Sequence, residues 1–158
     1  MRIVVMLAIL VLASVAPASA DQAFFGTAAS GGPYFSDPQP SFDHPRKIVL
    51  SLSERDPVRV NEVISNIGNI QRFYGADNVR IALVAYGPGI HAVLRDDSTV
   101  SERIKGLLAI GVHILACKQT LDTIHRTPDD LIKGVEIVPN GLPELVELQV
   151  RGWVYVRP

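Results

Sequence analysis

The pattern of apolar and polar positions divides the chain into three parts. An almost unbroken apolar run fills positions 3–15, a segment without regular periodicity follows to about position 45, and regular patterning begins near position 47. From there on, five runs rich in Val, Ile and Leu have the length of buried strands, and stretches with helical spacing separate them. The predicted strands are 47–53, 78–86, 112–117, 135–139 and 153–156.

The segments between these strands carry helix signals. The first helix is predicted to be capped by Asp56, to have Pro57 at its first position and to end at Gly75, because the apolar residues between them fall on one stripe. A helical stretch is also expected directly after the third strand. The other predicted helical segments are 98–110, a short piece at 127–130, and 143–151.

Strands that alternate with helices indicate right-handed crossover connections and a sheet covered on both faces. We therefore predict a three-layer α/β/α sandwich with a mostly parallel, five-stranded sheet. In such sheets the working site lies beyond the carboxyl ends of the strands. The loops expected at that edge are 51–57, 86–91 and 117–121.

The first twenty residues have the features of a signal peptide. A short positive start at Arg2 precedes the apolar run, and small residues ending at Ala20 form a signal-peptidase site. The run is too short for a membrane anchor, because about thirteen residues at ~1.5 Å each do not cross a core of ~30 Å. We predict cleavage after Ala20, a periplasmic or secreted protein, and no stable membrane anchor after cleavage.

Residues 21–45 form a Pro/Gly/Ser-rich segment that precedes the predicted α/β domain at 46–158. Four prolines exclude a helix or a central strand there. Two interpretations stay open: a flexible linker, or an arm whose aromatic side chains dock on its own domain or on a neighbouring subunit. The aromatic residues in question are Phe24, Phe25, Tyr34, Phe35 and Phe42.

Charge and composition exclude several classes of function. Fifteen Lys and Arg against sixteen Asp and Glu leave no basic excess for binding nucleic acid. A single cysteine excludes an intrachain disulfide and a zinc site built from several thiolates. The segment 87–92 matches the letters of a dinucleotide-binding turn, but Pro88 lacks the N–H that would hold a phosphate, and we interpret it as a plain turn. No metal and no cofactor are expected.

Cys117 is the strongest candidate for chemistry. It is predicted at the carboxyl end of the third strand, immediately before a helical stretch. There the unpaired N–H groups of the helix start and the adjacent cation of Lys118 favour the thiolate, which is the nucleophilic form. The alternative is a packed cysteine that ends a core strand, since cysteine is among the residues most often buried.

The remaining titratable residues have weaker assignments. His91, in the second loop, can reach the same end of the sheet as Cys117. His113 lies on the same strand face but about 13 Å away, and His125 approaches the thiol only if its helix folds back. The acidic pairs, for which we expect a role in helix capping, are Asp96 with Asp97 and Asp129 with Asp130.

The segment 111–121, GVHILACKQTL, resembles the cysteine loop of the DsrE/DsrF-like family of sulfur-relay proteins. Residues 134–158 are similar to the family's closing segment, 84–89 to its second strand and loop, and Asn66 and Asn69 to its first helix. The resemblance implies a small α/β/α fold, homo-oligomers such as trimers or hexamers, and a cysteine that carries sulfur as a persulfide. Carried over, Cys117 is the residue that accepts sulfur.

The leading hypothesis is therefore an exported sulfur carrier or sulfurtransferase-like protein that uses Cys117. Lys118 and the N–H groups of Gln119 and Thr120 would support the thiolate, and Gln119 or His91 would orient the donor. The expected partner is a thiol-bearing sulfur donor or acceptor protein. Two alternatives stay open: a non-catalytic oligomeric module that binds a small ligand or a protein around a structural cysteine, and a redox sensor that dimerises through Cys117.

Overall fold

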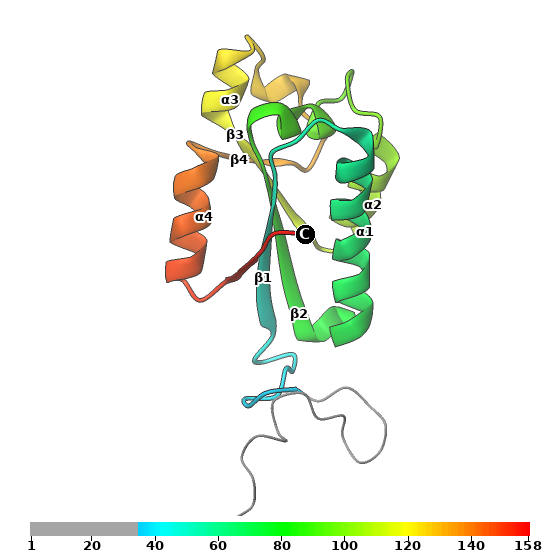
Figure 1. Ribbon diagram of the computed structural model, residues 1–158, viewed down its shortest axis with the longest axis vertical. Helices are drawn as coiled ribbons and strands as arrows, with labels where there is room; N and C mark the ends of the chain where they lie inside the picture. The colour runs from blue at the N-terminus through cyan, green and yellow to red at the C-terminus, as the bar shows by residue number, and fades with distance from the viewer. Residues whose placement is uncertain (1–34) are drawn as a thin grey trace, which may run out of the picture. The chain divides into compact units, whose positions relative to one another are not determined.

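A five-stranded sheet in which all strands are parallel forms the middle of the domain (Figure 1). The computed structural model describes residues 35–158, so the predicted signal peptide and most of the predicted arm lie outside the described residues. The strand order is β4-β3-β2-β1-β5. The strands are β1 (Arg46–Leu52), β2 (Val79–Ala85), β3 (His113–Cys117), β4 (Glu136–Val138) and β5 (Val154–Val156).

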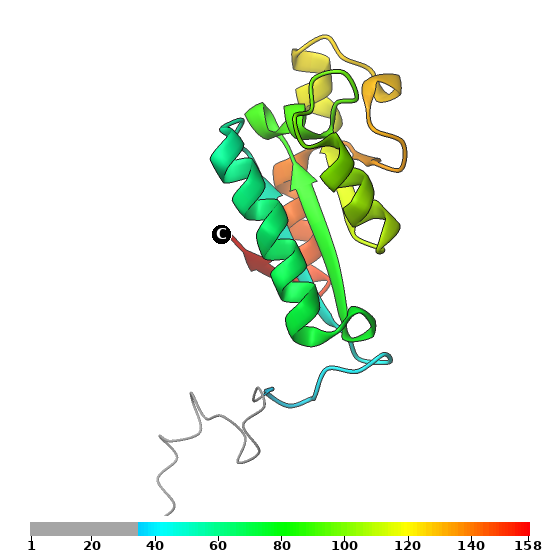
Figure 2. The same ribbon diagram turned by 90° about the vertical axis from the view of Figure 1, so that its right-hand side faces the viewer.

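Helices cover both faces of this sheet, which confirms the predicted three-layer α/β/α fold (Figures 1 and 2). The helices α1 (Pro57–Tyr74) and α2 (Ser101–Ala109) lie on one face, and α4 (Gly141–Val150) lies on the other. The first four strands follow one another across the sheet, and the chain then returns from β4 through α4 to β5. Because parallel crossovers are right-handed, this reversal places α4 on the opposite face.

Two apolar clusters hold the layers together. On the α1 and α2 side, Leu50, Leu83 and Ile114 are completely buried. On the α4 side, Val49 and Val84 pack with Leu148. Neighbouring strand residues thus point into different layers, which explains why the central strands are apolar at nearly every position.

Short segments at the carboxyl edge of the sheet differ from the prediction. The expected loop after β2 is a 3-10 helix, η3 (Gly87–Val93), and the helical stretch after β3 is α3 (Lys118–Thr123). The helix predicted from position 98 begins only at Ser101. In the turn before it, the Ser98 hydroxyl donates to the Ala92 carbonyl at 2.6 Å and accepts from the Val100 N–H at 3.2 Å. The last helix begins at Gly141, two residues before the predicted start.

The capping role predicted for the acidic pairs is correct at one pair and wrong at the other. Asp130 accepts a hydrogen bond from the backbone N–H of Thr127 at 2.8 Å, at the start of η4 (Pro128–Asp130). Asp97 instead interacts with His91 and Arg55, and α2 has no side-chain cap. The contacts with His91 and Arg55 thus take the place of the predicted cap.

In the segment before β1, Phe42 lies against a residue of β2. The guanidinium carbon of Arg80 lies 5.9 Å from the centre of the Phe42 ring, within the range of a cation–π contact. Among residues 35–158, no helix combines the length and the apolar character needed to cross a bilayer.

Candidate functional site

Cys117 is both the last residue of β3 and the residue that precedes the first turn of α3. Leu115, two positions earlier on the strand, packs on the α4 side of the sheet. Strand alternation therefore directs Cys117 to that same side. The residue is 3% exposed. The strand passes directly into the helix, so the thiol lies at the carboxyl edge of the sheet where the sequence placed it.

Hydrogen bonds make this buried thiol more acidic than an ordinary one. Burial by itself raises the pKa of Cys117, but hydrogen bonding by the Thr120 hydroxyl and by the backbone N–H groups of Thr120, Gly141 and Gln119 brings the pKa below its usual value; the Gln119 N–H also donates to the Pro139 carbonyl at 3.3 Å. All of these donors are neutral. The thiolate is therefore stabilised by fixed dipoles in a site that water barely reaches.

The donors belong to two helices that begin next to each other. Gln119 and Thr120 are in the first turn of α3, whereas Gly141 is the first residue of α4. Helix starts carry partial positive charge, so both favour an anion between them. Gly141 reaches this position only because it has no side chain: a Cβ there would lie 2.8 Å from the Cβ of Tyr86.

Thr120 is held in place by the loop that follows β2. The backbone N–H of Gly87 donates to the Thr120 hydroxyl oxygen at 3.1 Å. With its oxygen accepting this bond, the hydroxyl uses its own hydrogen to donate to the Cys117 sulfur. Gly87 has a φ of +51°, a conformation that favours glycine. Three loops of the sheet edge therefore meet at one sulfur atom.

Lys118 and Gln119 are close to Cys117 in sequence but have different surroundings. The ammonium of Lys118 lies 2.7 Å from the Asp122 carboxylate, one turn further along α3, and is not among the largest causes of the pKa shift of Cys117. The side-chain oxygen of Gln119 accepts a hydrogen bond from Asn140 at 3.3 Å. Gln119 thus connects the starts of α3 and α4 through its side chain.

His91 belongs to a separate cluster. Its Nδ1 donates to the Asp97 carboxylate, which also accepts from Arg55 at 3.0 Å. The bond to His91, assisted by the charge of Arg55, lowers the pKa of Asp97, although burial opposes the shift. These groups border a small cleft of about 140 Å³ beside the start of α1. Within residues 35–158, the largest causes of the pKa shift of Cys117 do not include His91.

An apolar cleft of about 610 Å³ lies along α4 on the same side of the sheet as the thiol. Tyr86 connects this cleft with the surroundings of Cys117, since it borders the cleft and packs against Gly141. The Tyr155 hydroxyl is fixed by a 2.8 Å hydrogen bond with Ser51. The cleft is lined by Tyr86, Leu142, Pro143, Leu145, Val146, Glu147, Gln149 and Tyr155.

Sequence reasoning identified the local donors of the site and missed the distant ones. Thr120 and Gln119 follow Cys117 directly, so a helix start predicts them. Gly141, Gly87 and Asn140 come from other strand ends, and their proximity depends on the strand order. Within the described part of the chain, no group of three His, Cys, Asp or Glu side chains is placed to hold a metal ion.

Comparison with known proteins gives a consistent picture. The model of the DsrE/DsrF-like family matches residues 51–158. The structure of the protein of unknown function MTH1491 from Methanobacterium thermoautotrophicum is 36% identical, with a TM-score of 0.68, over 72% of this chain and 99% of that one. The ychN protein from E. coli is 19% identical, with a TM-score of 0.60 over the same shares, and shows the fold alone. No curated protein sequence matches this chain.

Proposed function

The chain belongs to the DsrE/DsrF-like family, a family related to sulfur relay, and from this premise we propose that it is a sulfur carrier that holds sulfur as a persulfide on Cys117. The observation that carries the proposal is the lowered pKa of this one thiol, produced by donors from two helix starts. The thiolate, which a lower pKa favours, is the form that attacks sulfane sulfur.

Loading and unloading are both thiol exchange reactions. In loading, the Cys117 thiolate attacks the outer sulfur of a donor such as a polysulfide or thiosulfate. A bond forms between Sγ and that sulfur, and the donor's S–S bond breaks, so that a shortened polysulfide or sulfite leaves with the electron pair. In unloading, a partner's thiolate attacks the outer sulfur of the persulfide and Cys117 leaves as thiolate. The transferred sulfur keeps its oxidation state, so no oxidant is consumed.

The residues around the thiol have separate roles in this proposal. Thr120 and the N–H groups of Gln119 and Gly141 stabilise the thiolate before attack and after release. Gln119, fixed by Asn140, is the side chain that would orient a donor. Lys118 and His91 support the site only indirectly, because each is paired with a carboxylate of its own.

The experiment that tests this proposal is an intact-mass measurement on the purified protein. After treatment with polysulfide we expect a gain of one sulfur atom, reversed by a thiol reductant. The Cys117→Ser variant should remain folded by circular dichroism and gain nothing. Equal loading of the variant, or a folded wild-type protein that gains no sulfur, would contradict the proposal.

A second function, a binding module around a packed cysteine, is favoured by one observation. The thiol is nearly inaccessible, while an apolar cleft of about 610 Å³ lies along α4 on the same side of the sheet. The rate at which a disulfide reagent modifies folded protein separates the two functions. A rate near that of a free thiol supports the carrier, whereas modification only upon unfolding supports the module. Dimers on non-reducing electrophoresis would instead support a redox sensor.

We also propose that the protein acts in the periplasm or after secretion. The support is the signal-like sequence ending at Ala20. Protein recovered from the periplasmic fraction is expected to begin at Asp21 by mass spectrometry. A cytoplasmic protein that retains residues 1–20 would contradict this proposal and leave the chemistry of Cys117 unaffected.

A further inference from the structure

A groove of about 320 Å³ runs between α1 and α2, on the face of the sheet opposite to α4. It is therefore separate from the thiol and from the cleft along α4. The two helices are linked across it, because the guanidinium of Arg103 donates to the Ser65 hydroxyl at 3.0 Å and to the side-chain oxygen of Asn61. The polar and small residues that line it are Ser65, Gly68, Asn69, Arg72, Arg103 and Gly106.

The two arginines of this groove have neutral partners only. Arg72 donates to the side chain of Asn69 at 2.5 Å and to the Gly68 carbonyl at 3.4 Å, and Arg103 donates to α1 as described. Within residues 35–158, neither guanidinium forms a salt bridge. Elsewhere in the domain a carboxylate partner is common: the arginines that have one are Arg55, Arg59, Arg95, Arg126 and Arg151.

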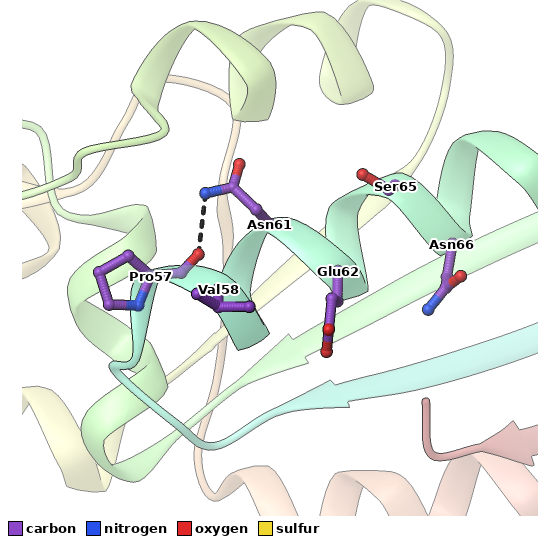
Figure 3. A pocket seen from close by; sticks show the side chains of 6 residues that line it. All are labelled: Pro57, Val58, Asn61, Glu62, Ser65 and Asn66. Atoms are coloured by element: carbon purple, nitrogen blue, oxygen red, sulfur yellow. Dashed lines mark hydrogen bonds between the residues drawn. The ribbon is translucent and has the colours of Figure 1, made fainter.

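The acidic residues of the two helices do not neutralise these charges. Glu62 lies 2.5 Å from Arg59, and Glu102 lies 2.7 Å from Lys105. Figure 3 shows Asn61 and Ser65 projecting from one side of α1, toward the helix that follows in the fold, and Glu62 projecting from the other side. The groove thus presents two positive charges with no negative charge between them.

Two glycines inside helices lie along the same groove. A Cβ built at Gly68 of α1 or at Gly106 of α2 meets no atom within 4 Å. Nothing within the described domain therefore requires glycine at either position, although glycine inside a helix is less stable than alanine. An absent side chain is useful where the backbone of another molecule approaches closely.

From these observations we infer that the groove between α1 and α2 binds an acidic helical segment of a partner protein. Its carboxylates would pair with Arg72 and Arg103, and its backbone would pack over Gly68 and Gly106. A groove between two helices is the shape into which a third helix fits, and arginine forms bidentate pairs with carboxylates. Nucleic acid is disfavoured because two arginines on a chain of net negative charge neutralise few phosphates.

The test uses a defined probe, an alanine-based helical peptide with glutamate at every fourth position, and a twin in which glutamine replaces glutamate. We expect the acidic peptide to bind by fluorescence anisotropy, to weaken with salt, and to shift the amide resonances of residues 65–72 and 103–107. The double variant Arg72→Gln/Arg103→Gln should weaken binding about tenfold or more. Arg151→Gln, at an exposed arginine directly after the end of α4, is the matched control and should leave binding unchanged.

A second set of variants tests the close approach. Gly68→Leu and Gly106→Leu keep the charge and fill the groove, so each should reduce binding severalfold while the domain stays folded. Equal binding of the two peptides, no binding at millimolar peptide, or unchanged binding in the arginine or leucine variants would overturn the inference. Sulfur loading of Cys117 is measured in every variant and should stay normal, so failure here is distinguishable from failure of the proposed function.

Discussion

At Cys117, neutral hydrogen-bond donors rather than a full positive charge lower the pKa of the thiol. The nearest cation in sequence, Lys118, is neutralised by Asp122 on the surface of α3. Salt screens interactions between exposed charges strongly and those of buried dipoles weakly. The reactivity of Cys117 should therefore depend little on ionic strength.

Replacing Thr120 tests the largest single stabilising contact. Thr120→Val removes the hydroxyl donor at almost constant volume, so the pKa of Cys117 should rise and its alkylation near pH 7 should slow. Thr120→Ser keeps the hydroxyl and is the matched control. The pH dependence of iodoacetamide labelling, followed by mass spectrometry, gives the pKa directly. An identical profile for Thr120→Val would show that the hydroxyl does not act on the sulfur.

The hydrogen bond between Asp97 and His91 makes the free energy of unfolding depend on pH. The pKa of Asp97 is lowered in the folded state. Its contribution to the free energy of unfolding is therefore present above the unfolded pKa of about 3.9 and is lost as the pH falls below that value. Asp97→Asn should lower the free energy of unfolding by about 1 kcal/mol at pH 7, and the difference from wild type should shrink toward pH 3. Urea titrations at a series of pH values measure this. A difference that stays constant with pH would exclude the linkage.

Sequence reasoning at the residue scale succeeded where the chemistry is local. Cys117 and Thr120 share one strand-to-helix junction, and the junction is readable from the pattern. The support expected from Lys118 stays a prediction, and its ammonium pairs with the Asp122 carboxylate one turn along the same helix, a partner that the sequence analysis did not name. Arg55 and Asp97 were missed as partners of His91, since they come from different loops.

Among the elements, η3 determines how the ends of β1 and β2 meet. Gly89 of η3 lies directly against the end of β1, where a Cβ would be 2.1 Å from the Leu52 carbonyl oxygen. The backbone N–H of Tyr86 donates to that same oxygen at 3.0 Å. The position of Gly87, and with it the position of Thr120, therefore depends on this contact.

Substitution of Gly89 should be among the most damaging changes in the domain. Gly89→Ala forces β1 and η3 apart and should cost about 3 kcal/mol of the free energy of unfolding. Gly106→Ala is the control with the opposite expected sign. The added Cβ meets no atom there, so alanine should raise the free energy of unfolding by about 0.5–1 kcal/mol. Thermal and urea unfolding of both variants measure the difference. Equal stability of the two variants would contradict the tight packing at Gly89.

At the scale of the whole molecule, one face has the character of an interface. Apolar residues spaced by four along α4 are exposed, and so are apolar residues of the edge strand β5. Large exposed apolar patches on a protein surface usually mark sites of contact with another molecule. These residues are Leu142, Val146, Val150, Val154 and Val156. A homo-oligomer formed through this face would bury them and border the cleft along α4.

We expect the protein to form trimers or hexamers, and Val146→Glu to dissociate them. Val146 is 56% exposed, so glutamate should be tolerated in the isolated domain but not in an apolar contact. Analytical ultracentrifugation gives the mass, and circular dichroism controls for folding. Glu102→Ala, on α2, should leave the mass unchanged. A wild-type monomer at micromolar concentration, or a variant with the wild-type mass, would exclude this interface.

The layers of the fold were predictable and the order of the strands was not. Apolar runs separated by helices such as Pro57–Tyr74 specify a covered parallel sheet, because no other common arrangement buries such strands on both faces. The position of β5 beside β1 depends on which way the chain turns after β4. The pairing of β4 with β3, in which Val138 lies opposite Cys117, brings Gly141 toward the thiol, and no local pattern in 139–143 indicates it.

The rigid junction between β3 and α3 has a consequence for the energetics of transfer. An S–S bond is about 2.05 Å long, so in a persulfide the negative charge lies one bond further out than the Sγ atom that the Thr120 hydroxyl and the N–H groups of Thr120 and Gly141 stabilise. These groups would therefore favour the empty carrier over the loaded one. They also make Cys117 a good leaving group, since a thiol of lower pKa departs faster. Such a site would bind its cargo loosely and release it readily, as a protein that passes sulfur onward requires.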